Sequence, residues 1–390
     1  MSRNLLRRRP YRAAAAVLLV IAVACAVAAT AFQSAVLNQA HLIPAVDNRV
    51  DIGFSGRAEV VFDSAAWLDD RPHGGQPDCA GPAARLGCFT RTAVPVEATG
   101  VITTAPDPQS RKNVAITARG SARAGGIPLW STTVTETVDR VHGRPADGTT
   151  VSARFDQPVV GVNDTPRILP APGTGLTFFF PPVTPLRSVE FFDPLTRTTT
   201  PIDYADPVPA DTVKNYAFHQ LTGPVNLSDN PAGNPSRLTV AAGRAYTGIE
   251  LRAQGLDPDT PVKLSRYRFV HRVVVVHRDS GIIVNETVKV RDEFARTRQE
   301  AAVQAFGTGG RVEPETFAPA GQRTALSMTA GYDKPTSDDA ADRALHFHRD
   351  LAAATRFRDI VWLMAGISLA AVGYLSAGAL RRRIRSAKVS

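Results

Sequence analysis

Two long apolar runs without a charged residue frame the chain, at residues 13–32 and 360–380. A helix rises about 1.5 Å per residue, so each run is long enough to cross the roughly 30 Å hydrocarbon core of a bilayer. The pattern therefore predicts two transmembrane helices. The alternatives are a cleaved signal peptide for the first run, in which Ala29-Thr30-Ala31 has the form of a cleavage site, and a buried core helix for the second.

Between these runs, apolar and polar residues alternate with the period of β-strands. Valine, threonine and phenylalanine form short runs, which are punctuated by the 29 glycines and 29 prolines of the chain. In residues 129–141, Trp130, Glu136 and Val138 fall on one face and threonines on the other, which favours a sheet with one wet face. The predicted fold class is mainly β with a few helices: a large antiparallel curved sheet flanked by two transmembrane helices.

Two hairpins are predicted from their turn sequences. The Asp-Pro-Leu-Thr turn at residues 193–196 joins strands at 189–192 and 198–202, because proline presets φ at the second turn position. The Asp-Ser-Gly turn at 279–281 closes a longer hairpin within residues 264–294, since glycine is free to take a positive φ. In the first strand of this longer hairpin, Arg266, Arg268, Arg272 and Arg278 share a face, and Tyr267, Phe269, His271 and His277 share the other.

Elsewhere the pattern predicts short strands at residues 216–221 and 246–251, and a helix at 293–306. A glycine- and proline-rich stretch then reaches residue 335. The polar residues at 336–339 are expected to cap a helix that begins near Ala340 and runs into the second apolar run.

Basic residues flank both apolar runs. Residues 1–12 and 381–390 hold ten of the 45 lysines and arginines and none of the 36 acidic residues, which leaves 35 basic against 36 acidic residues elsewhere. Because basic flanks resist translocation, we expect both termini in the cytoplasm and the main domain outside it. The net charge of +9 therefore reflects the topology of the chain, and it does not indicate a nucleic-acid partner.

The predicted organisation is a basic tail (1–12), a transmembrane helix (13–32), an exported β-rich domain (33–338), a juxtamembrane helix (339–358), a transmembrane helix (360–380) and a basic tail (381–390).

Cys79 and Cys88 flank a short loop inside a polar segment, residues 63–89, that is interpreted as an insertion. In an exported domain this spacing favours a local disulfide, with two free thiols as the alternative. A zinc site would need more ligands than His73 adds, and His271 and His277 are too far apart along a strand to share a metal. The sequence therefore predicts no metal and no other cofactor.

Phenylalanines concentrate around the first hairpin. The apolar groups there, with two aromatics from the longer hairpin, are candidates for lining a groove that holds an acyl chain; ordinary core packing is the alternative. Burial of an acyl chain contributes about 0.8 kcal/mol per CH₂, so such a groove would bind the chain without the help of charged residues. The candidate lipid-binding residues are Phe178, Phe179, Phe180, Phe191, Phe192, Tyr267 and Phe269.

Motifs of common enzyme classes are missing from the sequence. It has no G-x-S-x-G, P-loop, G-x-G-x-x-G after a strand, H-E-x-x-H or C-x-x-C pattern. Carboxylates are plentiful, but no pair is singled out by its spacing. The sequence therefore gives no positive support for catalysis, and the protein is predicted not to be an enzyme.

The order of features resembles the actinobacterial PorA-type family of two-anchor envelope proteins. The resemblance rests on the basic N-terminal anchor, the aromatic-rich turn at 191–197 leading to Pro201 and Tyr204, the strand at 216–220, the turn at 279–281 and the helix that enters the C-terminal span. The family has tryptophan or tyrosine before the Asp-Pro, where this chain has Phe192. The insertion at 63–89 is a departure from the family.

The resemblance implies a periplasmic β domain held at the inner membrane, associated with envelope glycolipid assembly and with mycolate-glycolipid exporters. The expected function is non-catalytic binding of an envelope lipid or glycolipid, with inner-membrane transport or assembly proteins as partners. A pore is disfavoured, because two helices enclose no channel and the strands show no lipid-facing pattern. The alternatives are a scaffold subunit of an envelope transporter that binds no lipid, and an envelope glycolipid hydrolase or transferase.

Overall fold

A computed structural model describes the chain in two compact units. The helix unit comprises Met1–Leu42 and Leu345–Ser390, and the sheet unit comprises Ile43–Ala344. The described residues are 9–73, 77–81, 83–146, 150–155, 169–170, 174–208, 214–229, 237–307 and 317–387, so most of the predicted N-terminal tail and the last residues of the C-terminal tail lie outside them.

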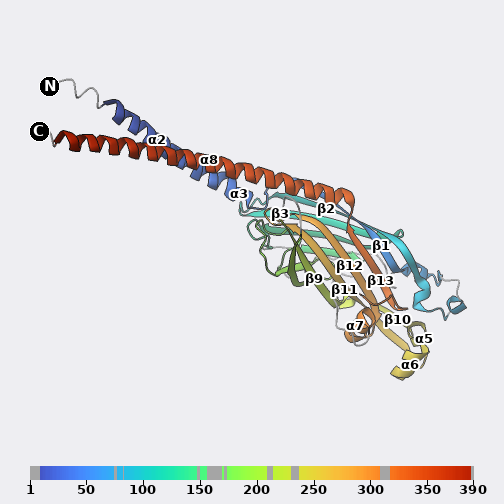
Figure 1. Ribbon diagram of the computed structural model, residues 1–390. Coiled ribbons are helices and arrows are strands. Elements are labelled where there is room, and N and C mark those ends of the chain that lie inside the picture. The colour runs from blue at the N-terminus through green and yellow to red at the C-terminus, as the bar shows by residue number, and fades with distance from the viewer. Residues whose placement is uncertain are drawn as a thin grey trace. The chain divides into compact units, whose positions relative to one another are not determined.

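The described part of the sheet unit contains one antiparallel sheet of thirteen strands, so the predicted fold class is confirmed. The order across the sheet is β6-β5-β4-β3-β2-β1-β13-β12-β11-β9-β8-β7, and β10 pairs with β11 beside β9. Figure 1 shows β1, β13 and β12 side by side, with α5, α6 and α7 gathered at one end of the strands. The strands are β1 (Asn48–Phe62), β2 (Thr90–Pro106), β3 (Asn113–Ala124), β4 (Ile127–Asp139), β5 (Thr150–Phe155), β6 (Leu169–Pro170), β7 (Val189–Asp193), β8 (Thr198–Val208), β9 (Asn215–Asn226), β10 (Arg237–Ala241), β11 (Pro261–His277), β12 (Ile283–Ala295) and β13 (Thr324–Tyr332).

Both predicted hairpins are confirmed. Strands β7 and β8 pair with Val189 opposite Ile202, and β11 and β12 pair across the turn at 279–281. Gly281 has φ +71°, and a Cβ atom there would lie 2.1 Å from the carbonyl oxygen of Phe180. Glycine is therefore required at this turn for both its conformation and its close contact.

The predicted strand at 246–251 is wrong, because this segment forms helix α6 (Gly248–Gln254) after a short helix α5 (Ala242–Ala245). A capping box explains the difference. The Thr247 side chain accepts from the Glu250 backbone N–H, and the Glu250 carboxylate accepts from the Thr247 N–H. This reciprocal pair satisfies two of the otherwise unpaired amides of a helix start.

The chain after β12 also differs from the prediction. Residues 293–295 complete β12, and helix α7 (Arg298–Phe306) begins only after Thr297, whose side chain caps it. The stretch expected to be irregular contains β13, which pairs with β1 and β12 in the middle of the sheet. Helix α8 (Lys334–Ala387) begins six residues before the predicted Ala340, because Asp333 accepts a hydrogen bond from the Thr336 N–H and caps it.

The helix unit contains α2 (Arg9–Phe32), the π-helical turn η1 (Gln33–Leu37), α3 (Asn38–Ala40) and most of α8. The ring of Phe32 lies 5.0 Å from that of Phe357, and Arg358 donates to the Gln33 side-chain oxygen at 2.8 Å. Two helices are long and apolar enough to cross a membrane, as predicted. Their exposed large apolar side chains include Val17, Leu19, Val20, Ile21, Val23, Val27, Ile360, Leu363, Ile367 and Leu369.

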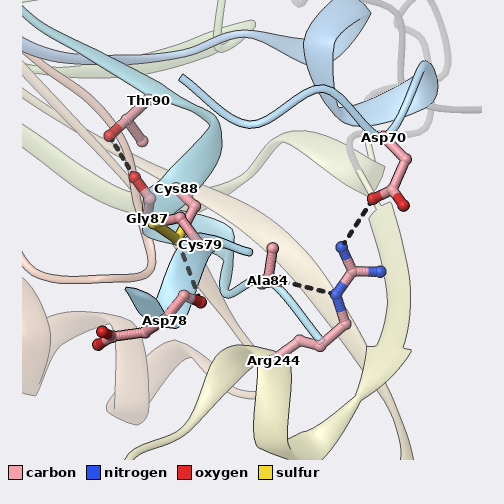
Figure 2. Close-up of a disulfide and its surroundings, with 8 residues drawn as sticks. All are labelled: Asp70, Asp78, Cys79, Ala84, Gly87, Cys88, Thr90 and Arg244. Carbon is pink, nitrogen blue, oxygen red and sulfur yellow. Dashed lines mark hydrogen bonds and ion pairs between the residues drawn. A yellow bond between two sulfur atoms is a disulfide. The ribbon is translucent and has the colours of Figure 1, made fainter. Parts of the chain in front are cut away.

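The segment at 63–89 holds a disulfide between Cys79 and Cys88, and both cysteines are 7% exposed. Helix α4 (Ser64–Leu68) and two 3-10 turns, η2 (Pro77–Cys79) and η3 (Leu86–Phe89), form this segment. Arg244 of α5 donates to the Ala84 carbonyl at 2.8 Å (Figure 2), and its guanidinium lies 4.2 Å from the centre of the Trp67 ring. Arg244 thus joins α5 to the disulfide loop by a hydrogen bond and to α4 by a cation–π contact.

Replacing both Cys79 and Cys88 with serine is expected to lower the free energy of unfolding by about 2–3 kcal/mol, because a closed loop of this length restricts the unfolded chain. The measurement is pulse proteolysis of the full-length protein in micelles across a urea series. Cys25→Ser, which changes the free cysteine of α2, is the matched control. An unchanged midpoint for the double variant would show that the bridge contributes nothing to stability.

Candidate functional site

Charged side chains are buried on the inner face of the sheet, which is the face toward which it curls. Arg266 and Arg268 extend from β11 to this face, and Asp292 extends from β12, directly opposite Arg268 in the strand register. All three are at most 2% exposed. These three residues form the inner charge cluster.

The geometry of the inner charge cluster is that of two arginines sharing one carboxylate. Arg268 donates from Nε to Oδ1 and from Nη2 to Oδ2 of Asp292, both at 2.8 Å. Arg266 donates from Nε to Oδ2, also at 2.8 Å. Burial by itself would raise the pKa of Asp292, but the two guanidiniums outweigh burial and hold this pKa below its ordinary value. The carboxylate is therefore ionised at neutral pH.

Contacts across the curl show that the inner face is filled. The guanidinium of Arg268 lies 5.1 Å from the centre of the Trp130 ring, although five strands separate β11 from β4 in the sheet. Phe192 of β7 likewise packs in one buried cluster with Ile116 of β3. Side chains from opposite ends of the sheet thus meet on its inner face.

A second charged group lies further along the same strands. Arg272 forms an ion pair with Glu286 of β12, with 2.9 Å between its Nε and the carboxylate, and donates from Nη1 to the Gln220 side-chain oxygen at 3.1 Å. Its guanidinium also lies 4.9 Å from the centre of the Phe191 ring and 3.9 Å from Asp193. Burial raises the pKa of Glu286, and Arg272 opposes this rise. The inner face therefore combines apolar packing with ion pairs sheltered from water.

The aromatic residues predicted to line a lipid groove do not come together. Phe180 and Phe191 pack in one buried cluster, and Phe192 packs in a second with Phe178 and Phe179 beside it. Tyr267 and Phe269 belong to a third cluster, where α7 covers the other face of β11. Among the described residues these side chains form three packed cores, which corresponds to the alternative of ordinary core packing.

The buried ion pairs were not identified from the sequence, although a signal for them was present. The alternation of residues places Arg266, Arg268 and Arg272 on one face of the strand. Glu286 and Asp292 have the matching parity on the partner strand. Opposite charges at paired positions of a predicted hairpin are a signal of cross-strand ion pairs.

Comparison with known proteins assigns the chain to a family. The family model for the porin PorA matches residues 14–375, which covers the sheet and most of both apolar helices. The chain belongs to the PorA porin family. A porin PorA of Corynebacterium resistens is 25% identical over 367 residues, covering 84% of this chain and 87% of that protein. A porin PorA of Corynebacterium amycolatum is 28% identical over 223 residues, covering 55% and 56% of the two chains.

PorA family membership confirms the resemblance and corrects the function expected from it. These relatives are named porins, that is, channel-forming proteins of the cell envelope. The predicted binding of an envelope lipid or glycolipid and the predicted role in glycolipid transport are therefore wrong. The same finding overturns the predicted transport and assembly partners, and the predicted two-pass location in the inner membrane. Of the seven candidate residues, Phe180, Phe191, Phe192, Tyr267 and Phe269 are buried, while Phe178 and Phe179 are partly buried.

Proposed function

We propose that this protein is a non-catalytic channel protein of the cell envelope. The observation that carries the proposal is the match of the porin PorA model to residues 14–375. The two apolar helices support it, because they carry exposed large apolar side chains over a length suited to a bilayer. The family is named for passage through a pore and not for a reaction, which agrees with the missing enzyme motifs.

The conducting path is proposed to form between several copies of the chain. In the described part of the sheet, inner side chains meet across the curl, where a channel through one copy would need open space. The opposite face carries exposed polar residues on β1 and β2, such as Ser55, Arg57, Glu97 and Thr99, where a lipid-embedded barrel would present an apolar band. A path built from more than one copy is consistent with both features.

Full-length protein added to planar lipid bilayers is expected to produce stepwise increases in conductance. The rate of channel appearance should rise more steeply than linearly with protein concentration, because several copies must assemble. Single-channel recording across a concentration series measures both quantities.

Two matched variants identify the part of the chain that enters the bilayer. Ile367→Asp places a charge in an apolar helix at a cost of about 3 kcal/mol and is expected to abolish the steps. Ile249→Asp changes another exposed isoleucine, in α6 of the sheet unit, and should leave the steps unchanged. If the unaltered protein produces no steps in any lipid mixture, the channel proposal is wrong. A strictly linear concentration dependence would reject assembly from several copies.

A further inference from the structure

Glu136 is a buried carboxyl group on the inner face, at a distance from the inner charge cluster. Strand β4 places it between Val134 and Val138, and it is 2% exposed. Thr177 donates from Oγ1 to Glu136 Oε2 at 3.1 Å, and Thr177 is itself buried. Val134 and Val138 belong to a cluster with Ile116 of β3 and Phe192 of β7, so apolar groups surround the carboxyl group.

The charged residues of the elements packed around Glu136 have partners of their own. Asp139 accepts from the amide groups of Val141 and His142 and contacts the His142 ring. Arg140 donates to the Ile43 carbonyl, and Asp193 accepts from amides of its own turn. On β3, the residues of the inner face near Ile116 are Val114 and Ala118, while Arg119 extends to the other face. Among the described residues, no charged group offsets the burial of Glu136.

The segment that supplies Thr177 connects two distant parts of the sheet. Leu176 donates its N–H to the Glu190 carbonyl at 2.7 Å and accepts from the Phe192 N–H at 2.8 Å, so the segment is joined to β7. Thr177 contacts β4, and β4 and β7 are separated by eight strands in the sheet order. Residues 176–180 thus bridge the opening of the curl, and the hydrogen bond to Glu136 is part of that bridge.

We propose that Glu136 and Thr177 form a protonation-dependent latch, which holds residues 176–180 across the curl when Glu136 is neutral and releases them when Glu136 is ionised. A neutral carboxyl group loses little by burial among apolar side chains, whereas an ionised one would lack a compensating charge. The latch is independent of the proposed channel function, since it concerns the folded sheet alone.

The direction of the pH effect follows from burial. Burial raises the pKa of Glu136 from 4.5 to about 7, and the Thr177 hydrogen bond lowers it only in part. The closed form therefore retains a proton that the open form releases. Closure is most favourable below the ordinary pKa, weakens as pH rises toward 7, and is at its weakest above 7.

Hydrogen–deuterium exchange of the full-length protein in micelles tests the latch. After correction for the intrinsic pH dependence of exchange, protection of residues 176–180 is expected to fall by up to about tenfold per pH unit between pH 5 and 7 and then to level off. Glu136→Gln, which stays neutral, should keep the segment protected at every pH. Glu97→Gln changes an exposed glutamate of β2 and should reproduce the unaltered profile. Thr177→Val should lower protection throughout while keeping the pH dependence.

Infrared spectroscopy provides an independent measurement. Spectra of the unaltered protein should contain the carbonyl band of a protonated carboxylic acid that disappears as pH rises through about 7. This band should be absent from Glu136→Gln, which separates it from any contribution of Glu286. A flat exchange profile in the unaltered protein, or the same profile in Glu136→Gln, would overturn the latch. Loss of the infrared band already near pH 4.5 would do so as well, because the carboxyl group would then be ionised in the closed form.

Discussion

Asp292→Asn is expected to destabilise the sheet unit by about 3–5 kcal/mol, a large part of the roughly 5–15 kcal/mol by which folded proteins are ordinarily stable. The substitution keeps the size of the side chain and removes its charge. Arg266 and Arg268, both at most 2% exposed, would then share a neutral amide as their partner. Removing the charge of Asp292 from its contact with two buried guanidiniums is costly, and this cost is larger than the net contribution of the intact ion pairs.

Pulse proteolysis of the full-length protein in a urea series measures this loss at neutral pH. The matched control is Asp51→Asn, because Asp51 pairs with Arg49 on the same sheet but at the surface, where both side chains are well exposed. Solvent-exposed pairs contribute little, so the control should keep the original midpoint. Equal midpoints for Asp292→Asn and the control would contradict the importance of the inner charge cluster.

The contribution of Asp292 also has a defined pH dependence. Its pKa is below the ordinary value of 3.8 in the folded protein, so the stabilisation is fully present above that value and is lost only as pH falls through the lower folded pKa. This direction is opposite to that of Glu136. Two buried carboxyl groups of one sheet thus respond differently to pH, because two guanidiniums accompany one and a single hydroxyl accompanies the other.

Features fixed by local sequence were predictable. The apolar runs gave the two candidate spans, and the turns at 193–196 and 279–281 gave both hairpins with the observed pairing. Strand β13 was missed because most of it is buried on both faces, as in Leu326, Ser327 and Met328, so its sequence lacks the alternation of a half-exposed strand. It lies between β1 and β12, where both faces are covered.

The candidate site could not be predicted from the sequence, because it depends on which distant strands meet across the sheet. The contact between Arg268 and Trp130 arises only because the sheet curls, and pairing along one hairpin does not determine it. The same limit applies to the phenylalanines. Their density near the first hairpin is visible in the sequence, but their division among separate packed clusters depends on the complete sheet.

Gly56→Ala is expected to destabilise the sheet unit by about 3 kcal/mol or more, at the upper end for an overpacked site. Gly56 of β1 lies opposite Ala330 of β13. A Cβ atom at position 56 would lie 2.0 Å from the Thr329 carbonyl oxygen and 2.6 Å from the Ala330 Cα. Both are backbone atoms of the paired strand, so no side-chain rotation relieves the clash and the strands must separate locally.

The position of this clash makes its effect large. Strand β13 joins the half of the sheet that ends at β6 to the half that ends at β7, and Gly56 lies on the β1 side of that junction. Gly321→Ala is the matched control, since a Cβ atom at residue 321 would meet no atom within 4 Å. The same urea series with pulse proteolysis compares the two variants. A midpoint for Gly56→Ala equal to that of Gly321→Ala would mean that β1 and β13 are not in close contact at this position, and the assigned register between them would then be wrong.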